Sequence, residues 1–435
     1  MERFDKMVEL AKLDSNPYQR DGVQWCLNME DTDKGGIIAD EMGLGKTITM
    51  IGTIVGNLER RTLVVVPVVL LEQWATQFKR LTGRDATIYH GPQKSTEKLA
   101  SARFVLTTYG MITVDSIVPV RNDIHKVRWN RIVFDEAHHL RNSKTGRYAG
   151  AALLNADKRW FMTGTPIQNK MADLISLFML LGVEANEQNI EKYILRRTKS
   201  QVGIKLPKVN EEVVNVPWSD EGEKKLAESI HSGLSFSGVA PSENTAKEHS
   251  FVMLTRARQV CAYPPLCPEG KGASKMDAVT KAILLRKNNG AGKLVFCNFR
   301  GEIDELAKRL RDGGIESVAT FDGRLGTTQR EKVLNNKTEV IVLQIQTGCE
   351  GLNLQEHFSE VYFCSPNWNP AIEDQAVARC HRIGQTKEVC VFKFVMDGFD
   401  SEKTISIDAH IQRSQEQKRK LMFSRTDSES GEKNK

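Results

Sequence analysis

Residues 36–48 read GIIADEMGLGKTI, and this short stretch decides how the rest of the sequence is interpreted. It begins with an apolar run at 36–39, continues through a glycine-containing loop, and becomes apolar again at Ile48. A strand, a loop and a helix in this order form the backbone setting in which proteins bind phosphate groups. Glycines allow several N–H groups to converge on the phosphate oxygens, and the helix N-terminus adds a partial positive charge. The stretch therefore predicts a nucleotide phosphate site within an α/β fold.

Two side chains of this loop have specific expected roles. Lys46 is expected to contact the β- and γ-phosphates, and the hydroxyl of Thr47 is expected to ligate magnesium. The general phosphate-loop pattern has glycine where this chain has Asp40, so a glycine-containing turn with an exposed lysine is the alternative. The predicted nucleotide contacts of the loop are Asp40, Gly43, Leu44, Gly45, Lys46 and Thr47.

An acidic motif, DEAH at 135–138, follows the hydrophobic run at 132–134. Carboxylates that follow a parallel strand emerge at the C-terminal edge of the sheet, where open α/β sheets bind ligands. Asp135 is expected to hold magnesium, and Glu136 to orient and deprotonate the attacking water. The alternative is a surface helix cap, which the upstream phosphate loop disfavours. The pair therefore predicts phosphoryl-transfer chemistry.

Short runs of β-branched and apolar residues recur along the chain, and a helix-like stretch follows each of them. Near-continuous apolar strands that alternate with helices are typical of parallel sheets covered on both faces. The runs fall into two groups separated by a long interval, so we expect two α/β lobes. The first group lies at 36–39, 63–66, 104–107 and 131–134, and the second at 294–296, 340–343 and 361–363.

The interval between the two groups, at 166–290, predicts helices and an inter-lobe hinge near Leu206. Apolar residues recur there with helical spacing, at Leu174, Leu177, Phe178 and Leu181. Two later stretches, 232–250 and 264–274, are polar and loop-prone. The expected domains are an N-terminal lobe at 1–205, a helical insertion with a C-terminal lobe at 206–423, and a disordered tail at 424–435.

Length and composition indicate a soluble, intracellular protein of two domains. The 435 residues exceed one ordinary domain, and a hydrophobic share of 40% supplies enough material for two cores. No apolar run approaches the ~20 residues that cross a bilayer. The charged N-terminus lacks the features of a secretory signal. A net charge of +6 is compatible with a nucleic-acid partner, although many metabolic enzymes have a similar charge.

The eight cysteines predict free thiols and no metal site. They form no C-x-x-C pair, and no second pair at zinc spacing follows Cys261 and Cys267. We therefore expect mostly buried thiols in a reducing compartment.

Residues 374–385 read DQAVARCHRIGQ and place Arg379 and Arg382 three positions apart. On a helix, this spacing puts both guanidinium groups on one face. Arginines directed at a γ-phosphate stabilise the charge of the transition state, which is the role of an arginine finger. Taken alone, such a pair is also typical of a solvated basic surface.

The motifs, in their order along the chain, resemble those of the Swi/Snf family of helicase-like, double-stranded-DNA-dependent ATPases. The resemblance extends over 17–395, and one motif departs from it: cysteine and glutamate at 349–350 replace the usual paired glycines. In this family the phosphate loop has the form found here, so Asp40 supports the resemblance. The motifs are NPYQ at 16–19, DEMGLGKT at 40–47, VP at 66–67, QW at 73–74, TTY at 107–109, DEAH at 135–138, TGTP at 163–166, LRRT at 195–198, VFCNF at 295–299, GCEGLNL at 348–354 and DQAVARCHRIGQ at 374–385.

The resemblance implies two RecA-like lobes that close around Mg-ATP and step along duplex DNA without separating its strands. It implies that Gln19 reads the adenine base and that Gly351 lies at the nucleotide. Lys46 on one lobe and the pair Arg379 and Arg382 on the other would then contact the same phosphates. Closure would be favoured only by contacts that hydrolysis removes.

The resemblance also implies sites for DNA, contacted mainly through its phosphates. Candidates are Thr107 and Thr108 in the first lobe, and Asn353 with Trp368 in the second. Thr163 and Thr165 would couple the nucleotide and DNA sites, the alternative being a simple turn before Pro166. A basic stretch with Lys199, Lys205 and Lys208 is also typical of solvated surface.

Two other functions compete with a duplex-DNA motor. A DEAH-type RNA helicase shares the acidic motif, and a catalytically silent nucleic-acid-binding module could share the fold. The expected partners are double-stranded DNA, nucleosomes or other DNA-bound proteins, and a targeting subunit, with no membrane. Chromatin remodelling, repair and viral transcription stay open as roles, in a nucleus or a viral DNA compartment.

Overall fold

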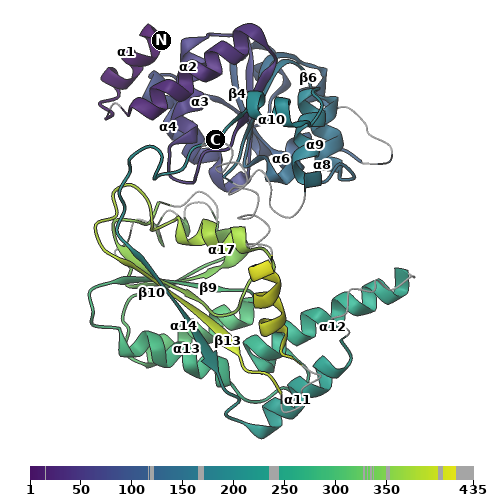
Figure 1. Cartoon of the computed structure of the whole chain (residues 1–435), viewed down its shortest axis with the longest axis vertical. Helices are drawn as coiled ribbons and strands as arrows, with labels where there is room; N and C mark the ends of the chain where they lie inside the picture. The colour runs from purple at the N-terminus through teal and green to yellow at the C-terminus, as the bar shows by residue number, and fades with distance from the viewer. Residues whose placement is uncertain are drawn as a thin grey trace, which may run out of the picture. The chain divides into compact units, whose positions relative to one another are not determined.

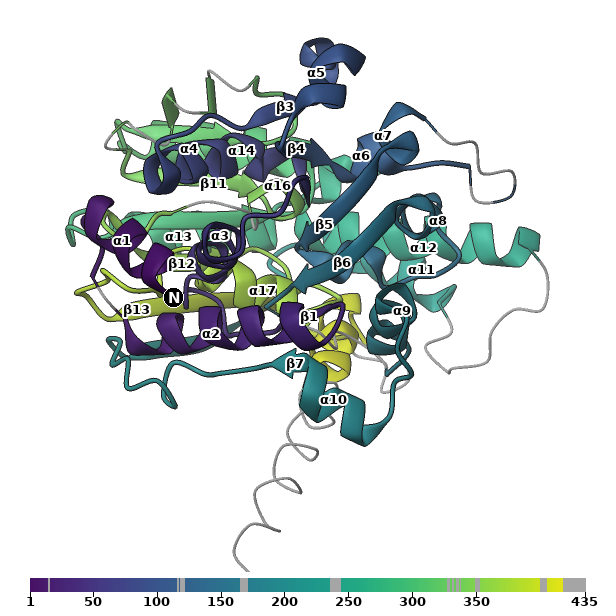
Figure 2. The ribbon, with the colours of Figure 1, turned by 90° about the horizontal axis from the view of Figure 1, so that it is seen from above.

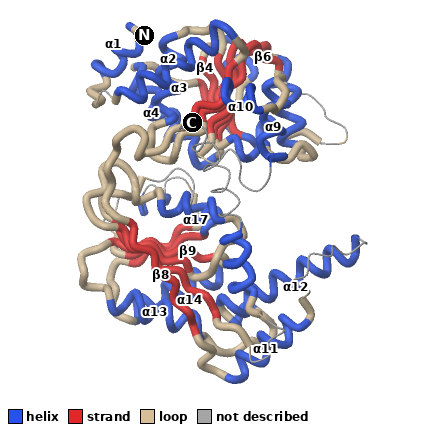
Figure 3. The backbone as a smooth tube through the Cα atoms, in the orientation of Figure 1, coloured by secondary structure: helices blue, strands red, loops and turns tan. Residues whose placement is uncertain are grey.

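The computed structural model of the chain divides into two compact units, Met1–Lys205 and Leu206–Lys435. In each unit a sheet lies among helices, as the red strands and blue helices of Figure 3 show. The structure describes residues 1–14, 16–115, 117, 122–164, 171–234, 244–326, 329–330, 332–333, 336, 338–348, 353–399 and 405–417.

The first unit is built on a seven-stranded sheet with the order β3-β4-β2-β5-β6-β1-β7, and every pairing in it is parallel. Its central strands are continuous apolar runs because helices cover both faces. The strands are β1 (Gly35–Ile38), β2 (Thr62–Val66), β3 (Thr87–Tyr89), β4 (Phe104–Thr108), β5 (Arg128–Asp135), β6 (Asn155–Met162) and β7 (Ile194–Leu195).

Two groups of helices cover this sheet. The first consists of α1 (Glu2–Leu10), α2 (Pro17–Thr32), α3 (Lys46–Gly56) and α4 (Leu71–Thr82). In this group α2 packs on α3, and α1 packs on both α3 and α4. The second consists of α6 (Tyr109–Ile112), α8 (Gly146–Leu153) and α9 (Met171–Leu181) on the other face, as Figure 1 shows. The remaining helices are α5 (Thr96–Ser101), α7 (Asp123–Lys126) and α10 (Glu187–Tyr193), and Figure 2 shows α2 alongside β1 with β7 beyond it.

Strand register brings the ends of three strands of the first unit to one level. Met162, the last residue of β6, is the register partner of Asp135 at the end of β5 and of Ile38 at the end of β1. The loop that follows β1 and the motif that follows β5 therefore leave the sheet at the same edge.

The second unit contains a six-stranded parallel sheet with the order β10-β11-β9-β12-β13-β8. Two cores lie against it: one includes Ile303 of α14, and the other includes Ala376 of α17. The strands are β8 (Val209–Val216), β9 (Gly292–Cys297), β10 (Val318–Phe321), β11 (Val340–Gln344), β12 (Phe358–Phe363) and β13 (Val389–Met396). The described helices are α11 (Glu221–Ser232), α12 (Asn244–Ala262), α13 (Ser274–Leu285), α14 (Arg300–Asp312), α16 (Ile345–Gly348), α17 (Pro370–Val377) and a last helix at 407–417.

The interval at 166–290, for which we expected helices and a hinge, differs from that expectation in two places. Strand β8 lies inside it and pairs along its full length with β13, 180 residues later, so its strand character depends on a distant partner. The stretch 232–250 is not a loop throughout, because α12 begins at Asn244. The expected helix around Leu174 is present as α9.

The expected fold class, α/β with two parallel-sheet lobes and helices between the two groups of strands, is confirmed. Among the described residues, no helix combines the length and apolarity of a membrane span. The seven described cysteines are free thiols, and all except Cys390 are buried, as expected.

Candidate active site

The loop between β1 and α3 has the backbone geometry of a phosphate cradle. Gly43 and Gly45 have φ angles of 92° and 79°, in the left-handed region that glycine adopts without strain. Gly45 is the N-cap of α3, which begins at Lys46, so the free N–H groups of this helix face the loop. The Lys46 ammonium donates a hydrogen bond to the carbonyl oxygen of Asp40 across the loop, at 2.7 Å. Thr47, half-buried, follows on the first turn of α3.

Gln19, the predicted adenine reader, lies directly on this loop. It is buried in the first turn of α2, and its Nε2 donates to the carbonyl oxygen of Leu44 at 3.2 Å. A Cβ atom on Gly45 would lie 2.4 Å from the same Nε2, so a side chain at Gly45 would displace the amide. Leu44 itself is fully buried, and its carbonyl oxygen is the acceptor of the Gln19 hydrogen bond.

Asp40, which replaces the usual glycine, is fully buried and makes an ion pair with Arg197. The residues after β7 continue alongside the loop, where the backbone N–H of Glu41 donates to the Arg197 carbonyl oxygen at 2.9 Å. For Lys199 the sequence left two interpretations open, a DNA contact or solvated surface. In the structure its ammonium pairs with the Glu41 carboxylate at 3.1 Å. The LRRT segment therefore fixes the phosphate loop.

Asp135 is the last residue of β5, and three groups hold it in place. The Trp74 indole N–H donates to Oδ2 at 2.7 Å, and the backbone N–H of Glu136 donates to Oδ1 at 2.9 Å. The Tyr109 hydroxyl donates to the Asp135 carbonyl oxygen at 2.7 Å. Burial, and then the neighbouring charge of Glu136, raise the pKa of Asp135 to about 6. A buried carboxylate that resists ionisation is chemically suited to a divalent cation, whose charge favours the ionised form.

Glu136 occupies a backbone conformation that side chains rarely adopt. Its φ and ψ angles are 49° and 50°, in the left-handed region. Such strain persists where the surrounding structure imposes it, and it is frequent at functional sites. Its carboxylate Oε2 lies 3.3 Å from His138 Nδ1. The turn places the Glu136 carboxylate beside His138, and its charge still acts on Asp135.

The TGTP motif lies against the same loop. Thr163 is fully buried, and its backbone N–H donates to the Ile38 carbonyl oxygen at 3.0 Å. A Cβ atom on Gly164 would lie 2.7 Å from the Met42 side chain. Thr165, the other predicted coupler, lies outside the described residues.

In the second unit, Arg379 and Arg382 do not lie on a helix as expected. Helix α17 ends at Val377, and both arginines lie in the turns that follow it. Burial and then the charge of the nearby Arg379 lower the pKa of Arg382 to about 10. Two neighbouring guanidinium groups in a partly buried setting are chemically suited to bind an anion. Gly351, the other predicted nucleotide contact here, lies outside the described residues.

The turns that carry these arginines depend on Gln385, a residue for which the motifs predicted no separate role. Its Nε2 donates to the carbonyl oxygens of Cys380, Gln355 and Phe358 at 3.0–3.1 Å, and its Oε1 accepts from two backbone N–H groups. Gly384, with φ of 97°, allows the chain to turn just before it. These bonds join segments far apart in sequence, which explains why helical spacing was misleading.

The candidate DNA contacts differ in accessibility. Thr107 and Thr108 are fully buried; the Thr107 hydroxyl donates to the Tyr89 carbonyl oxygen, and the Thr108 hydroxyl bonds to His90. Direct contact of their side chains with DNA is therefore not supported in this conformation. Asn353 is exposed and bonds to Arg382. Trp368 is half-buried and meets the His410 ring edge-on.

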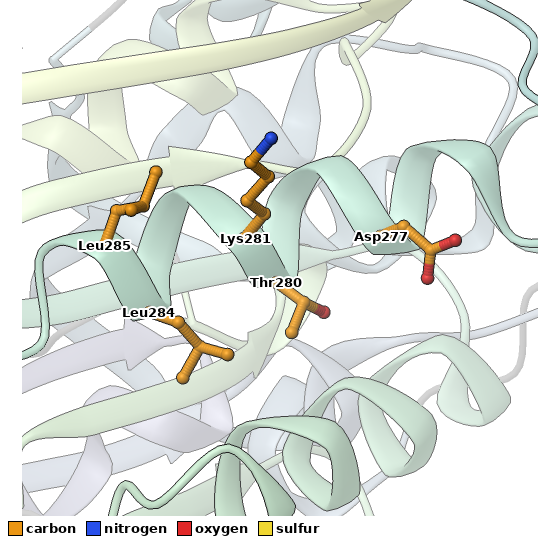
Figure 4. Close-up of a pocket in the computed structure, with 5 residues that line it drawn as sticks. All are labelled: Asp277, Thr280, Lys281, Leu284 and Leu285. Atoms are coloured by element: carbon orange, nitrogen blue, oxygen red, sulfur yellow. The ribbon is translucent and has the colours of Figure 1, made fainter.

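A separate hollow on the second unit contains none of the predicted site residues. It runs along α13 and is lined by Asp277, Thr280, Lys281, Leu284 and Leu285, as Figure 4 shows.

The site in the first unit thus brings together the Gln19 amide, the loop at 40–47 with Lys46, and the carboxylates of Asp135 and Glu136 at one sheet edge. Sequence reasoning gave Trp74 and Arg197 no role in this site, although both lie in quoted motifs, QW and LRRT. Each of them bonds to an acidic residue of another motif, Trp74 to Asp135 and Arg197 to Asp40. A search for such pairs between motifs is the signal that could have found them.

Comparisons with known proteins support this assembly of motifs. A model of the SNF2-related domain matches residues 18–189, and a model of the helicase conserved C-terminal domain matches residues 274–384. A probable global transactivator of Orgyia pseudotsugata multicapsid polyhedrosis virus is 28% identical over 87% of this chain and 86% of its own length. The ATP-dependent DNA helicase DDM1 of Arabidopsis thaliana is 26% identical over 86% of this chain and 58% of its own length.

A solved structure, the Sulfolobus solfataricus SWI2/SNF2 ATPase core in complex with dsDNA, is 26% identical, with 89% of each chain covered and a TM-score of 0.43. The chain spans less than half the length of several other curated relatives. Because the two family models match in the expected order and include the phosphate loop, the acidic motif and both arginines, the chain belongs to the Snf2 family of helicase-like ATPases of superfamily two.

Proposed function

We propose that this chain is an ATP-dependent double-stranded DNA translocase that uses magnesium and remodels protein–DNA complexes. The observation that carries the proposal is the common sheet edge at which β1 releases the phosphate loop and β5 releases Asp135 and Glu136. Membership of the Snf2 family implies ATP hydrolysis, and the geometry supports a division of labour among the residues.

In the proposed site, Gln19 contacts the adenine base, and the N–H groups of the loop and Lys46 contact the phosphates. Thr47 and Asp135 would hold Mg²⁺, which supplies charge neutralisation and orientation of the phosphates. Glu136 orients the attacking water and accepts its proton, which its distinct backbone conformation allows. Arg379 and Arg382 neutralise charge that develops on the γ-phosphate.

The proposed track is duplex DNA, bound mainly through its phosphates. Support comes from the family, from the name of the Arabidopsis relative as a DNA helicase, and from the net charge of +6. Of the predicted contacts, we retain exposed Asn353 and half-buried Trp368, and we leave out the buried side chains of Thr107 and Thr108. Chromatin remodelling, repair and viral transcription are the roles that such a motor would serve, with or without a targeting subunit.

The test is the ATPase rate of the full chain with no polymer, single-stranded DNA, duplex DNA, duplex RNA and nucleosomes, at two salt concentrations. Stimulation by duplex DNA that weakens with salt is expected, because binding releases counterions from the phosphates. Stimulation by RNA alone would favour a DEAH-type RNA helicase. Absence of turnover with every polymer would favour a silent binding module.

A further inference from the structure

The Asp40 carboxylate is held by one guanidinium group in a fixed, two-pronged geometry. Arg197 Nε donates to Oδ1 at 3.0 Å, and Nη2 donates to Oδ2 at 2.5 Å. Because Asp40 is fully buried, its charge requires a buried cationic partner. Paired bonds of this kind fix orientation as well as charge, which a lysine ammonium does not do.

The same guanidinium group also holds the adenine-reading segment. Its Nη1 donates to the carbonyl oxygen of Tyr18, and its Cζ lies over the Tyr18 ring, 5.6 Å from the centroid. Tyr18 directly precedes Gln19, whose amide bonds to Leu44 of the phosphate loop. Arg197 therefore closes a ring of contacts that contains both the base-reading residue and the phosphate loop.

The space for this guanidinium group is provided by Gly22 in the middle of α2. A Cβ atom on Gly22 would lie 2.7 Å from Arg197 Nη2, too close to be accommodated without movement. The backbone of Arg197 is itself fixed, because the Ala39 and Glu41 N–H groups donate to the carbonyl oxygens of Leu195 and Arg197.

We propose that Arg197 is a positioning residue that couples adenine recognition to the geometry of the phosphate loop. The inference rests on the proposed ATP site and deepens it. One side chain sets the position of Tyr18 and Gln19 relative to residues 40–47, so its loss should weaken ATP binding and base selectivity together.

The test is nucleotide binding by the full chain without DNA, measured with fluorescent N-methylanthraniloyl-ATP and by competition with ATP and GTP. Arg197→Lys keeps the charge but loses the paired bonds, so the Kd for ATP should rise about tenfold. Its preference for ATP over GTP should fall as well. Gly22→Ala would place a Cβ against the guanidinium and 3.1 Å from Thr49 Cγ2, so it should weaken ATP binding and also lower the melting temperature.

The matched control is Arg131→Lys, which alters another buried bidentate pair of the same unit. Arg131 bonds to Glu30, both are buried, and neither is among the residues of the nucleotide site. This variant should melt earlier and bind ATP with wild-type affinity.

Three results would overturn the inference in different ways. ATP affinity within twofold of wild type in Arg197→Lys, or in Gly22→Ala if the lysine variant does not fold, removes the coupling role. An equal loss of ATP affinity in Arg131→Lys would show that the effect of Arg197→Lys reflects a general loss of stability. Failure of the wild-type chain to bind either nucleotide would instead overturn the proposed function, and this inference with it.

Discussion

Asp135 and Glu136 are neighbours in sequence, but the structure gives them different environments. Trp74, Tyr109 and the Glu136 backbone surround Asp135, and burial raises its pKa to about 6. Glu136 has a left-handed backbone conformation that costs about 1–3 kcal/mol, and its carboxylate lies beside His138. Two carboxylates with separate environments can perform two separate roles, metal binding and water activation.

Glu136→Gln should retain ATP binding and slow hydrolysis by about 10²–10⁴-fold, because the amide cannot accept the proton of the attacking water. Single-turnover hydrolysis and labelled-ATP binding measure the two effects separately. Lys46→Ala is the comparison variant and should lose binding itself. Unchanged turnover in Glu136→Gln would exclude a role as general base.

Asp135 should also make the stability of the metal-free protein depend on pH. Its pKa rises from 3.8 in the unfolded chain to about 6 in the folded chain, so its contribution to stability is present below about pH 4 and lost as pH rises through 6. Asparagine cannot ionise, so the Asp135→Asn variant does not lose stability in this way as the pH rises. Its stability relative to wild type should therefore increase by on the order of 1–3 kcal/mol between pH 4.5 and pH 7.5 in EDTA. Urea unfolding at both pH values tests this, and a pH-independent difference would contradict it.

Among the elements, the turns after α17 carry the arginine pair, and they are held by side-chain bonds and not by a helix. Gln385 supplies three donor contacts and two acceptor contacts within this segment. The phosphate loop follows the same rule, since Arg197 and Gln19 fix it from outside. Both candidate functional segments are therefore irregular backbone that side-chain hydrogen bonds stabilise.

Gln385→Ala should lower the free energy of unfolding by about 1–3 kcal/mol, because buried carbonyl oxygens lose their donors. It should also slow ATP turnover, because the turn that holds Arg382 loses its supports. Urea unfolding and ATPase assays measure both effects. Thr386→Ala removes an exposed side chain of the same turn and is the control. An equal effect of the two variants would show that Gln385 has no special role.

For the whole molecule, the groups assigned to the nucleotide belong to two compact units. The phosphate loop and carboxylates belong to the first, and the two arginines belong to the second. Binding of ATP and its hydrolysis should therefore be separable by substitution in the full chain.

Arg382→Ala should leave ATP binding near wild type and slow turnover by about 10³-fold or more, as expected for an arginine finger. Arg311→Ala removes an equal charge from the exposed surface of α14 and should do neither. Stopped-flow binding and steady-state ATPase rates decide the outcome. A turnover loss below tenfold would make Arg382 a structural residue.

Much of this protein could be predicted locally. The apolar runs at 63–66 and 104–107 form β2 and β4, and Leu174 lies on α9, because burial on both faces or on one face leaves a periodic signal. Strand β8 left no such signal, since half of its residues are exposed and its partner is β13. The helical position of the two arginines was wrong for a related reason, because Gln385 bonds across the chain.

The sequence by itself determined the α/β class, the phosphate loop and the acidic motif, because these depend on residue types at short spacing. Tertiary structure alone decided that Thr107 and Thr108 are buried, that Trp74 holds Asp135, and that Arg197 joins Tyr18 to Asp40. These contacts link residues up to 179 positions apart. Their formation depends on strand order and register, which bring distant side chains together and which no local pattern of residues specifies.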